Sequence, residues 1–321
     1  MTLINIEKIA KALEVSIQVL FYMEYKEILE TASTHLASMK GQIMPVLEVA
    51  RPNDIEYAKH LAKVISKLSP LVGNMIEYNV CTELNKLEWL NNGIWRRQDP
   101  GFPDTVFDGN IYPIPGIEIK TWFPLATEIT ARFKDSIRFF DDDQTNVALV
   151  AWLPEFIIFG KPKIIDVWVG TAKSLAMARD THYNNPPDYL VFEPEDTTDR
   201  TSNLQQTNTN GYKFQGTKNE FSKALEIVKS WGEGYSVYDY SAEYQGKIKQ
   251  LLGSFSYRLD TNFAKIDRIE HLELEAFKLR VLNTKILNHT IKQWSKIISD
   301  SNSDITKFVD DIIKLTQATS V

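Results

Sequence analysis

The spacing of apolar residues changes from helical to strand-like partway along the chain, and this change limits the possible folds. From Ile4 to about Glu88, apolar residues recur every three or four positions, which predicts helices. Beyond that point the period becomes two, and the strand candidates are Asn146 to Leu153, Ile164 to Gly170 and Asp188 to Pro194. Helical spacing returns in TEITARFKDSIRFF and TAKSLAMAR. Strands alternating with helices predict an α/β or α+β fold, with a mixed central sheet flanked by helices.

Local signals predict where individual elements begin and turn. Ser69 and Pro70 suit the N-cap and the first residue of a helix, so a helix is expected from Pro70 to about Leu90. Asp108-Gly109 is typical of a tight hairpin turn. The strand that begins at Asp104 is therefore expected to reverse there and to return through GIEIKTWF.

The chain is expected to divide into three consecutive regions. Residues 1–68 form an N-terminal helical region, residues 69–235 contain the predicted sheet, and residues 236–321 form a C-terminal helical region. The stretch EPEDTTDRTSNLQQTNTNGYKFQG, from Glu193 to Gly216, has few apolar residues and many amides. It predicts a long polar loop, and loops of that length are usually functional or disordered.

Composition limits the compartment and the cofactors. The single cysteine, Cys81, excludes an internal disulfide framework and a metal site built from several thiolates. The N-terminus lacks the pattern of a signal peptide, and no run approaches the ~20 apolar residues of a membrane span. We therefore expect a cytoplasmic protein with no membrane partner. The 5 histidines lack metal-ligand spacing and no glycine-rich phosphate loop is present, which argues against zinc and ATP.

Three charged residues stand out in FPDTVFDGNIYPIPGIEIKTWF, because Asp104 begins one apolar run and Glu118 and Lys120 lie in the middle of another. On a strand, Glu118 and Lys120 point to the same face, while the isoleucines beside them point to the core. Asp104 begins the neighbouring antiparallel strand and is close enough to reach them. Two carboxylates and a lysine suit phosphodiester hydrolysis, because carboxylates hold Mg²⁺ and a lysine stabilises charge on the phosphate. The alternative is an ion pair on a solvated sheet face, with Asp104 as a turn residue.

These residues resemble the signature of the PD-(D/E)xK nuclease superfamily, to which most type II restriction endonucleases belong. The match consists of PD at 103–104 and EIK at 118–120. The resemblance implies a restriction-endonuclease-like fold. It also implies that Asp104, Glu118 and the main-chain carbonyl of Ile119 hold Mg²⁺, and that Lys120 positions or activates a water.

The helix before the motif carries a second resemblance. VGNMIEYNV resembles the corresponding helix of the mismatch-repair strand-nicking endonuclease and its restriction relatives. The resemblance implies that Glu77 is a further catalytic residue. The alternative is that Glu77 occupies an ordinary exposed helix position.

Several basic and amide side chains are candidates for DNA contact. Basic side chains bind phosphates, and asparagine or glutamine can bond adenine bidentately. The candidates are Arg96, Arg97, Gln98, Arg132, Lys134, Gln205 and Asn208. Solvated loops and a charged helix face are the alternatives. The net charge of −6 does not decide between them, because local patches determine phosphate contact.

The resemblance implies a Mg²⁺-dependent, site-specific double-strand DNA endonuclease of the type II restriction kind. Cutting both strands of a palindromic site implies a homodimer. A companion DNA methyltransferase is also expected. Two alternatives stay open: a repair or strand-nicking nuclease of the same fold, and a DNA-binding protein whose nuclease fold is inactive.

Overall fold

The computed structural model describes most of the chain, which forms two compact units. The described residues are 8, 11–12, 17–89, 93–98, 100–133, 135, 137–140, 142–183, 190–193, 211–233, 241–260 and 265–299. Unit 1 is built from Met1–Ala131, Phe140–Lys173 and Leu272–Val321, and unit 2 from Arg132–Phe139 and Ser174–His271. Each unit therefore contains segments that are distant in the sequence.

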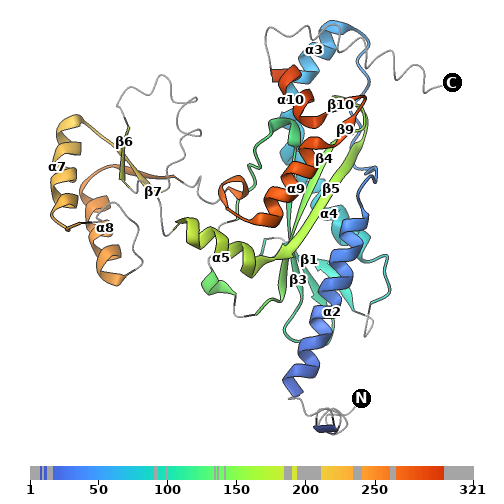
Figure 1. Ribbon diagram of the computed structural model, residues 1–321, viewed down its shortest axis with the longest axis horizontal. Coiled ribbons are helices and arrows are strands. Elements are labelled where there is room, and N and C mark those ends of the chain that lie inside the picture. Colours follow the sequence, from blue (N-terminus) through green and yellow to red (C-terminus); the bar gives the residue numbers. More distant parts are fainter. Residues whose placement is uncertain are drawn as a thin grey trace. The chain divides into compact units, whose positions relative to one another are not determined.

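Five strands form the central sheet of unit 1, in the order β1-β2-β3-β4-β5 (Figure 1). Neighbouring strands are antiparallel except β3 and β4, which are parallel. The strands are β1 (Ile94–Arg97), β2 (Thr105–Asp108), β3 (Gly116–Trp122), β4 (Thr145–Pro154) and β5 (Pro162–Thr171). The predicted mixed central sheet is confirmed. Strand β4 is buried along its whole length, as expected of a central strand covered on both faces.

Helices from both ends of the described chain belong to unit 1. From the N-terminal side come α2 (Ile17–Ser38), α3 (Ile55–Val64), the short 3-10 helix η1 (Ile65–Leu68) and α4 (Ser69–Leu84). A second 3-10 turn, η3 (Pro124–Ala126), follows β3. The C-terminal side adds α9 (Leu272–Asn283), the two-residue strands β9 (Lys285–Ile286) and β10 (His289–Thr290), and α10 (Ile291–Ser299). Ser295 of α10 donates a hydrogen bond of 2.6 Å to the carbonyl of Leu125 in η3, which anchors this last helix.

The two faces of the sheet differ in character at β3. We call the face that carries Glu118 and Lys120 the carboxylate face, and the opposite face, with Ile117 and Ile119, the aliphatic face. Both isoleucines are fully buried, with exposed fractions of 0% and 1%. The predicted alternation along this strand is therefore confirmed.

Helices α2 and α4 cover the aliphatic face. Asn146, which lies opposite Ile117 in the sheet, donates a hydrogen bond of 3.0 Å to Ser33 Oγ of α2. Helix α4 approaches the same face where Gly73 meets Thr121. These two helices close the core on this side of the sheet.

Helix α9 packs on the carboxylate face. Its Phe277 ring lies 6.0 Å from the ring of Trp122, two residues after Lys120 on β3. Asp166 is in the same row of the sheet as Trp122, through Ala151, and accepts a hydrogen bond of 3.1 Å from Arg280 Nε of α9. Helix α9 therefore covers the part of this face formed by the end of β3 and by β4 and β5.

The β1 and β2 part of the sheet is covered on one face only among the described residues. On the aliphatic face, Trp89 lies against Trp95 and Phe107 at 5.7 and 5.8 Å. On the carboxylate face, the register aligns Ile94 with Asp108 and Arg96 with Val106. Apart from the half-buried Val106, these side chains are exposed. We call Ile94, Arg96, Val106 and Asp108 the open strip.

The helix and hairpin predicted around the PD motif form with different limits. Helix α4 ends at Leu84 rather than near Leu90, because the Asn85 side chain bonds the backbone of Trp95 on β1 instead of continuing the helix. Strands β2 and β3 pair antiparallel as predicted. The prediction of a tight turn at Asp108-Gly109 was wrong. Strand β2 ends at Asp108, and β3 starts only at Gly116, after a longer connection.

Two further predictions were wrong. The helix expected from Thr127 to Phe140 is an irregular segment whose Ile129 and Phe133 are each buried. Its only regular turn among the described residues is the 3-10 helix η4 (Ile137–Phe139), where the Ile137 N–H bonds Asp180 rather than an earlier carbonyl. The C-terminal region is not helical throughout, because strands β8 (Tyr257–Asp260), β9 and β10 interrupt it.

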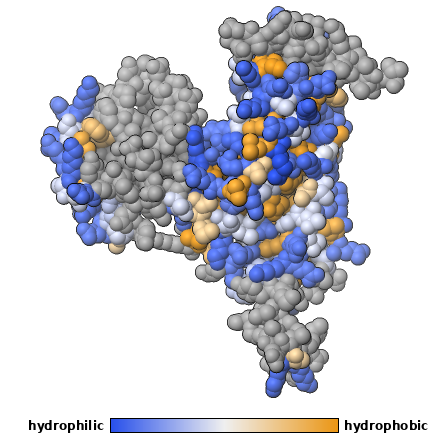
Figure 2. Space-filling view, in the orientation of Figure 1, coloured by the Kyte–Doolittle hydropathy of each residue, from blue (hydrophilic) through white to orange (hydrophobic). Residues whose placement is uncertain are grey.

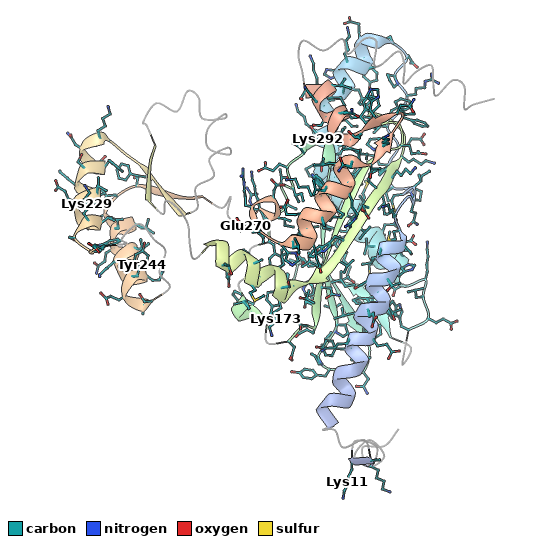
Figure 3. All side chains as sticks on the ribbon, viewed as in Figure 1. Lys11, Lys173, Lys229, Tyr244, Glu270 and Lys292 are labelled. Atoms are coloured by element: carbon teal, nitrogen blue, oxygen red, sulfur yellow. The ribbon has the colours of Figure 1, made fainter. Side chains whose placement is uncertain are left out.

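Unit 2 has its own small sheet and core. Strands β6 (Leu190–Glu193), β7 (Gly211–Gln215) and β8 form a sheet in the order β6-β7-β8. The helices are α7 (Lys218–Lys229) and α8 (Ala242–Ser254), with η6 (Ile266–Arg268) following, and α5 (Ala172–Tyr183) leads into the unit. The core residues Phe214, Ala224, Val228 and Leu251 pack together. Figure 3 labels Tyr244 on α8. Its ring lies edge to face against Trp231, with ring centroids 5.9 Å apart.

The predicted polar loop falls partly on a strand, because β7 occupies Gly211–Gln215. Residues 194–210 lie outside the described residues, as does the end of the predicted C-terminal helical region.

Apolar side chains also reach the surface of unit 1. Leu272 and Leu279 of α9 are 87% and 60% exposed. Figure 2 shows apolar residues interspersed with hydrophilic ones on the face that it draws. None of the helices in the described ranges combines the length and the apolar character that crossing a membrane requires.

Candidate active site

The start of β2 and the middle of β3 bring the PD and EIK residues together. The pairing of Thr105 with Ile117 places Asp104 beside the section of β3 that carries Glu118. The backbone N–H of Asp104 donates to Glu118 Oε2 at 3.1 Å, and Asp104 Oδ2 accepts from the backbone N–H of Ile119 at 2.7 Å. Lys120 Nζ forms an ion pair with Glu118 Oε1. Asp104, Glu118 and Lys120 therefore form one connected group.

Burial perturbs both charged groups on β3. It raises the pKa of Glu118 to about 7 from an ordinary 4.5, and Asp104 adds to the rise, whereas Lys120 opposes it. Burial lowers the pKa of Lys120, but Glu118, Asp104 and Glu77 outweigh this effect and hold it above its usual value. The lysine is therefore protonated at neutral pH, next to a glutamate that titrates near neutrality.

Glu77 lies on α4, the helix on the aliphatic face, and is within electrostatic range of Lys120. It is half-buried, and its charge contributes to the raised pKa of Lys120. Four residues before it on the same helix, Gly73 approaches β3 so closely that an added Cβ would lie 2.7 Å from Thr121 Oγ1. The absence of a side chain at Gly73 therefore allows α4 to lie where Glu77 is within electrostatic range of Lys120.

We expect Gly73→Ala to destabilise the protein by about 1–3 kcal/mol, because the new methyl group overlaps Thr121 Oγ1. The gain in helix propensity, ~1 kcal/mol, offsets only part of this loss. The measurement is urea unfolding followed by circular dichroism. Adding Thr121→Ala removes the overlapping atom and should recover stability in the double variant.

The matched control for this change is Gly246→Ala in the middle of α8. Nothing lies within 4 Å of a Cβ added there. We expect this variant to be neutral or more stable by up to ~1 kcal/mol. If Gly73→Ala were as well tolerated as Gly246→Ala, the close approach of α4 to β3 would be refuted.

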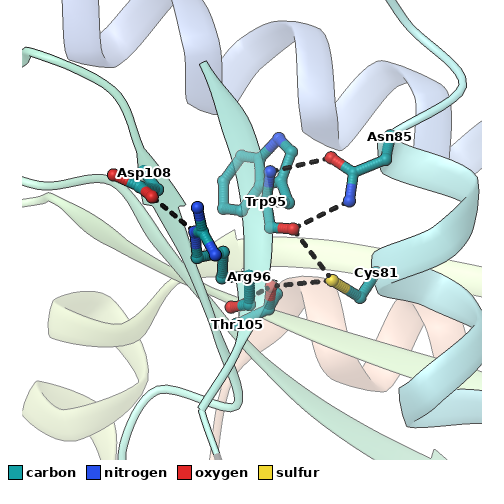
Figure 4. Close-up of polar contacts among 6 residues, drawn as sticks. All are labelled: Cys81, Asn85, Trp95, Arg96, Thr105 and Asp108. Carbon is teal, nitrogen blue, oxygen red and sulfur yellow. Dashed lines mark hydrogen bonds and ion pairs between the residues drawn. The ribbon is translucent and has the colours of Figure 1, made fainter.

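A polar network fixes α4 to the strands that carry the motif (Figure 4). Asn85 makes two hydrogen bonds with the backbone of Trp95, one from its amide to the carbonyl at 2.7 Å and one from the Trp95 N–H at 2.8 Å. Cys81 Sγ donates to the same carbonyl at 3.3 Å, and Thr105 Oγ1 donates to the carbonyl of Arg96 at 3.0 Å. Thr105 directly follows Asp104, so the network ties the helix of Glu77 to the strand of Asp104.

Pro103 supports the motif from the other side. It packs over Gly116, where an added Cβ would lie 2.3 Å from Pro103 Cγ. The preceding turn is held by Gln98, whose Nε2 donates to the carbonyl of Phe102 at 2.9 Å. The main-chain N–H of Gln98 also donates to the carbonyl of Asp104 at 2.8 Å. The position of Asp104 is therefore fixed on both sides.

The oxygen atoms of this group fit a hard divalent cation. Asp104 and Glu118 supply carboxylates, and Ile119 supplies a main-chain carbonyl. In a strand, the N–H and C=O of one residue point to the same edge, so the bond from Ile119 N–H to Asp104 indicates that the carbonyl also faces this edge. The raised pKa of Glu118 shows that burial leaves its negative charge incompletely balanced, which a cation would correct.

These residues do not form a complete set of protein ligands around a metal ion. In the described ranges, no group of three or more histidine, cysteine, aspartate or glutamate side chains is placed to hold a metal ion. Mg²⁺ differs from zinc or calcium in this respect, because it usually binds through one or two carboxylates and keeps several waters. The paired carboxylates of Asp104 and Glu118 satisfy that smaller requirement.

The predicted DNA-binding residues are scattered. Arg97 is exposed on β1, but it lies opposite Thr105 and so points to the aliphatic face, away from Glu118 and Lys120. The Gln98 side chain is used within its own turn. Arg132 belongs to unit 2, where it forms a single β-bridge with Lys265. Lys134, Gln205 and Asn208 lie outside the described residues.

Sequence reasoning missed strand β1 and, with it, the orientation of Arg96. Arg96 is two strands from β3 and points to the carboxylate face, in the same row as Val106 and Gly116. The signal was present in IWRR, because a buried tryptophan at position 95 requires its neighbour at 96 to point to the opposite face.

Comparisons of the chain with protein-family models, curated proteins and solved structures give no match.

Proposed function

We propose that this chain is a Mg²⁺-dependent, site-specific double-strand DNA endonuclease of the type II restriction kind. The observation that carries the proposal is the convergence of Asp104, Glu118 and Lys120 on one edge of an antiparallel strand pair. The raised pKa of Glu118 supports it, because strongly perturbed groups cluster at functional sites. A purely structural ion pair would not explain why a second carboxylate, Asp104, lies in the same group.

Each residue has a distinct role in the proposed reaction. Asp104, Glu118 and the Ile119 carbonyl would hold Mg²⁺. When bound, this ion supplies Lewis-acid stabilisation of phosphate charge and a more acidic water. Lys120 is protonated, so it acts as a hydrogen-bond donor and positive charge toward the phosphate oxygens or the attacking water, not as a base. Glu77 adds a carboxylate that helps to keep Lys120 charged.

The same proposal covers the fold type and the partners. A helix, an antiparallel strand pair bearing the motif and a parallel neighbour agree with a restriction-endonuclease-like fold. Cleavage of both strands at a palindromic site requires two such sites related by a two-fold axis, which favours a homodimer on DNA. The natural setting would be the cytoplasm, with a DNA methyltransferase that protects the host sites.

Plasmid cleavage tests the proposal directly. We expect supercoiled plasmids that contain the recognition sequence to become linear with Mg²⁺ and to stay intact in EDTA. Linear fragments with constant ends identify a site-specific double-strand cut. Nicked circles as the final product would instead favour a strand-nicking nuclease, and DNA binding without cleavage on a genome-wide set of sequences would favour an inactive fold.

A further inference from the structure

We propose that the open strip is part of the DNA-binding surface, and that Arg96 binds a backbone phosphate next to the one held at Asp104, Glu118 and Lys120. The inference rests on the proposed nuclease function. It adds a substrate-binding residue that lies outside the PD and EIK motifs. The reasoning depends on the sheet register, on the exposure of the strip and on the charge of Arg96.

The register places Arg96 on the same face as the catalytic group. Arg96 aligns with Val106 on β2, and Val106 aligns with Gly116 on β3. Residues that lie directly opposite each other in a sheet point to the same face, and so do alternate residues of one strand. Gly116, Glu118 and Lys120 are alternate residues. Arg96 therefore points to the carboxylate face.

The separation suits two phosphates of one DNA backbone. Two strand spacings of ~4.8 Å and two residues of ~3.3 Å put the Cα atoms of Arg96 and Glu118 about 12 Å apart. Each strand of duplex DNA carries one phosphate per ~3.4 Å of axis, so neighbouring phosphates of the same strand fall within that distance of the scissile one. A long arginine side chain can reach such a neighbour, and its planar guanidinium can bind two phosphate oxygens at once.

The open strip is accessible to a molecule as large as a duplex. The side chains of Arg96 and Asp108 are 62% and 54% exposed, and Ile94 is 43% exposed. Helix α9 covers this face on the side of β3 to β5, where Phe277 meets Trp122 and where Glu273 accepts a hydrogen bond from Trp168 in the row of Lys120. Between the strip and the candidate active site, Pro103 covers Gly116, and no helix among the described residues intervenes. A duplex bound at Lys120 would therefore extend over it.

Asp108 keeps Arg96 in place until DNA arrives. Arg96 Nε and Asp108 Oδ2 form an ion pair across β1 and β2 (Figure 4). An exposed pair of this kind contributes little to stability, so a phosphate can replace the carboxylate as the partner of Arg96 at small cost.

The test compares two neighbouring arginines on opposite faces. Binding of the full-length protein to a mixed-sequence duplex is measured in Ca²⁺, by fluorescence anisotropy, over ~50 to ~200 mM salt. We expect Arg96→Ala to weaken binding about tenfold and to reduce the slope of log K against log salt by ~1. Arg97→Ala, which removes the same charge from the aliphatic face, is the matched control and should change binding less than twofold.

A conservative variant separates the effect of the positive charge from the effect of the planar guanidinium, which can bind two phosphate oxygens. Arg96→Lys keeps the positive charge and should restore the salt slope while recovering only part of the affinity. Equal losses in Arg96→Ala and Arg97→Ala, or no loss in either while the wild type binds, would overturn the assignment of Arg96 and leave the nuclease proposal intact. If the wild type bound no duplex at any salt concentration, the nuclease proposal would fail as well.

Discussion

Replacing Lys120 with methionine is expected to slow DNA cleavage by about 10²–10⁴-fold, the range found when a charged donor or a proton-transfer group is removed from an active site. Methionine keeps much of the side-chain volume but removes the ammonium group that pairs with Glu118. The loss of the ammonium group has two effects on the site. The donor to the phosphate disappears, and the pKa of Glu118 rises further because Lys120 no longer lowers it. The measurement is single-turnover cleavage of a plasmid in Mg²⁺.

A second lysine gives the matched control for this experiment. Lys86 Nζ pairs with Glu83 Oε1 at 2.6 Å, and the Glu83 side chain is buried, with 9% exposed. Lys86 lies beyond the end of α4, outside the candidate active site. Lys86→Met therefore removes a comparable ion pair and should cut DNA at the wild-type rate. If Lys120→Met also retained the wild-type rate, the assignment of the catalytic group would be refuted.

Replacing Glu118 with glutamine is expected to abolish cleavage and to remove a pH-dependent loss of stability. The pKa of Glu118 is raised to about 7 in the folded protein, so the folded state retains a proton that the unfolded chain releases above about pH 4.5. The wild type should therefore lose free energy of unfolding as the pH rises from ~5 to ~8, by a total on the order of 3 kcal/mol. Glutamine does not titrate, so the variant should not show this loss.

The informative quantity is the difference between the two proteins at each pH. Any constant effect of leaving Lys120 without Glu118 cancels when the slopes are compared. Tryptophan fluorescence during urea unfolding suits the measurement, because Trp231 is the one tryptophan of the 7 in the sequence that belongs to unit 2. Ca²⁺ should stabilise the wild type more at pH 8 than at pH 6, and should have little effect on Glu118→Gln. If the free energy of unfolding changed with pH at the same slope in both proteins, the inference that Glu118 is buried and binds a proton near neutral pH would be wrong.

The sheet was largely predictable because its strands carry strong local patterns. NVALVAWL and IIDVWVG are almost entirely apolar, and they form β4 and β5 with limits close to those expected. The group of Asp104, Glu118 and Lys120 was predictable for a related reason. Strand alternation alone places the last two together, and the antiparallel pairing of β2 with β3 brings in the first.

Other parts depend on contacts between distant segments, which no local pattern contains. The segment from Thr127 to Phe140 has helical spacing, but it passes from unit 1 to unit 2 at Arg132, and its Ile137 N–H bonds Asp180. Strand β7 lies in an amide-rich stretch and forms through pairing with β6 and β8. The reversal between β9 and β10 uses Leu287 and Asn288, both with positive φ, without the Asn-Gly signal that usually marks such a turn.

The orientation of Arg96 shows why a charged residue is hard to assign without the strand that carries it. Two adjacent arginines look equivalent in the sequence. Trp95 is buried with 1% exposed, which fixes the aliphatic side of β1 and sends Arg96 to the other side. Without the assignment of these four residues to a strand, the sequence does not show which of the two arginines lies on the face of Glu118 and Lys120.

The insertion of unit 2 between β5 and α9 also sets an order for assembly during synthesis. The ribosome completes Asp104, Glu118 and Lys120 long before it makes α9, the helix whose Phe277 packs against Trp122 on the same face of the sheet. Because domains fold as units, the nascent sheet keeps this apolar surface uncovered while residues 174–271 are translated. In the proposed nuclease, such a delay would separate the synthesis of the catalytic group from the completion of the stable enzyme.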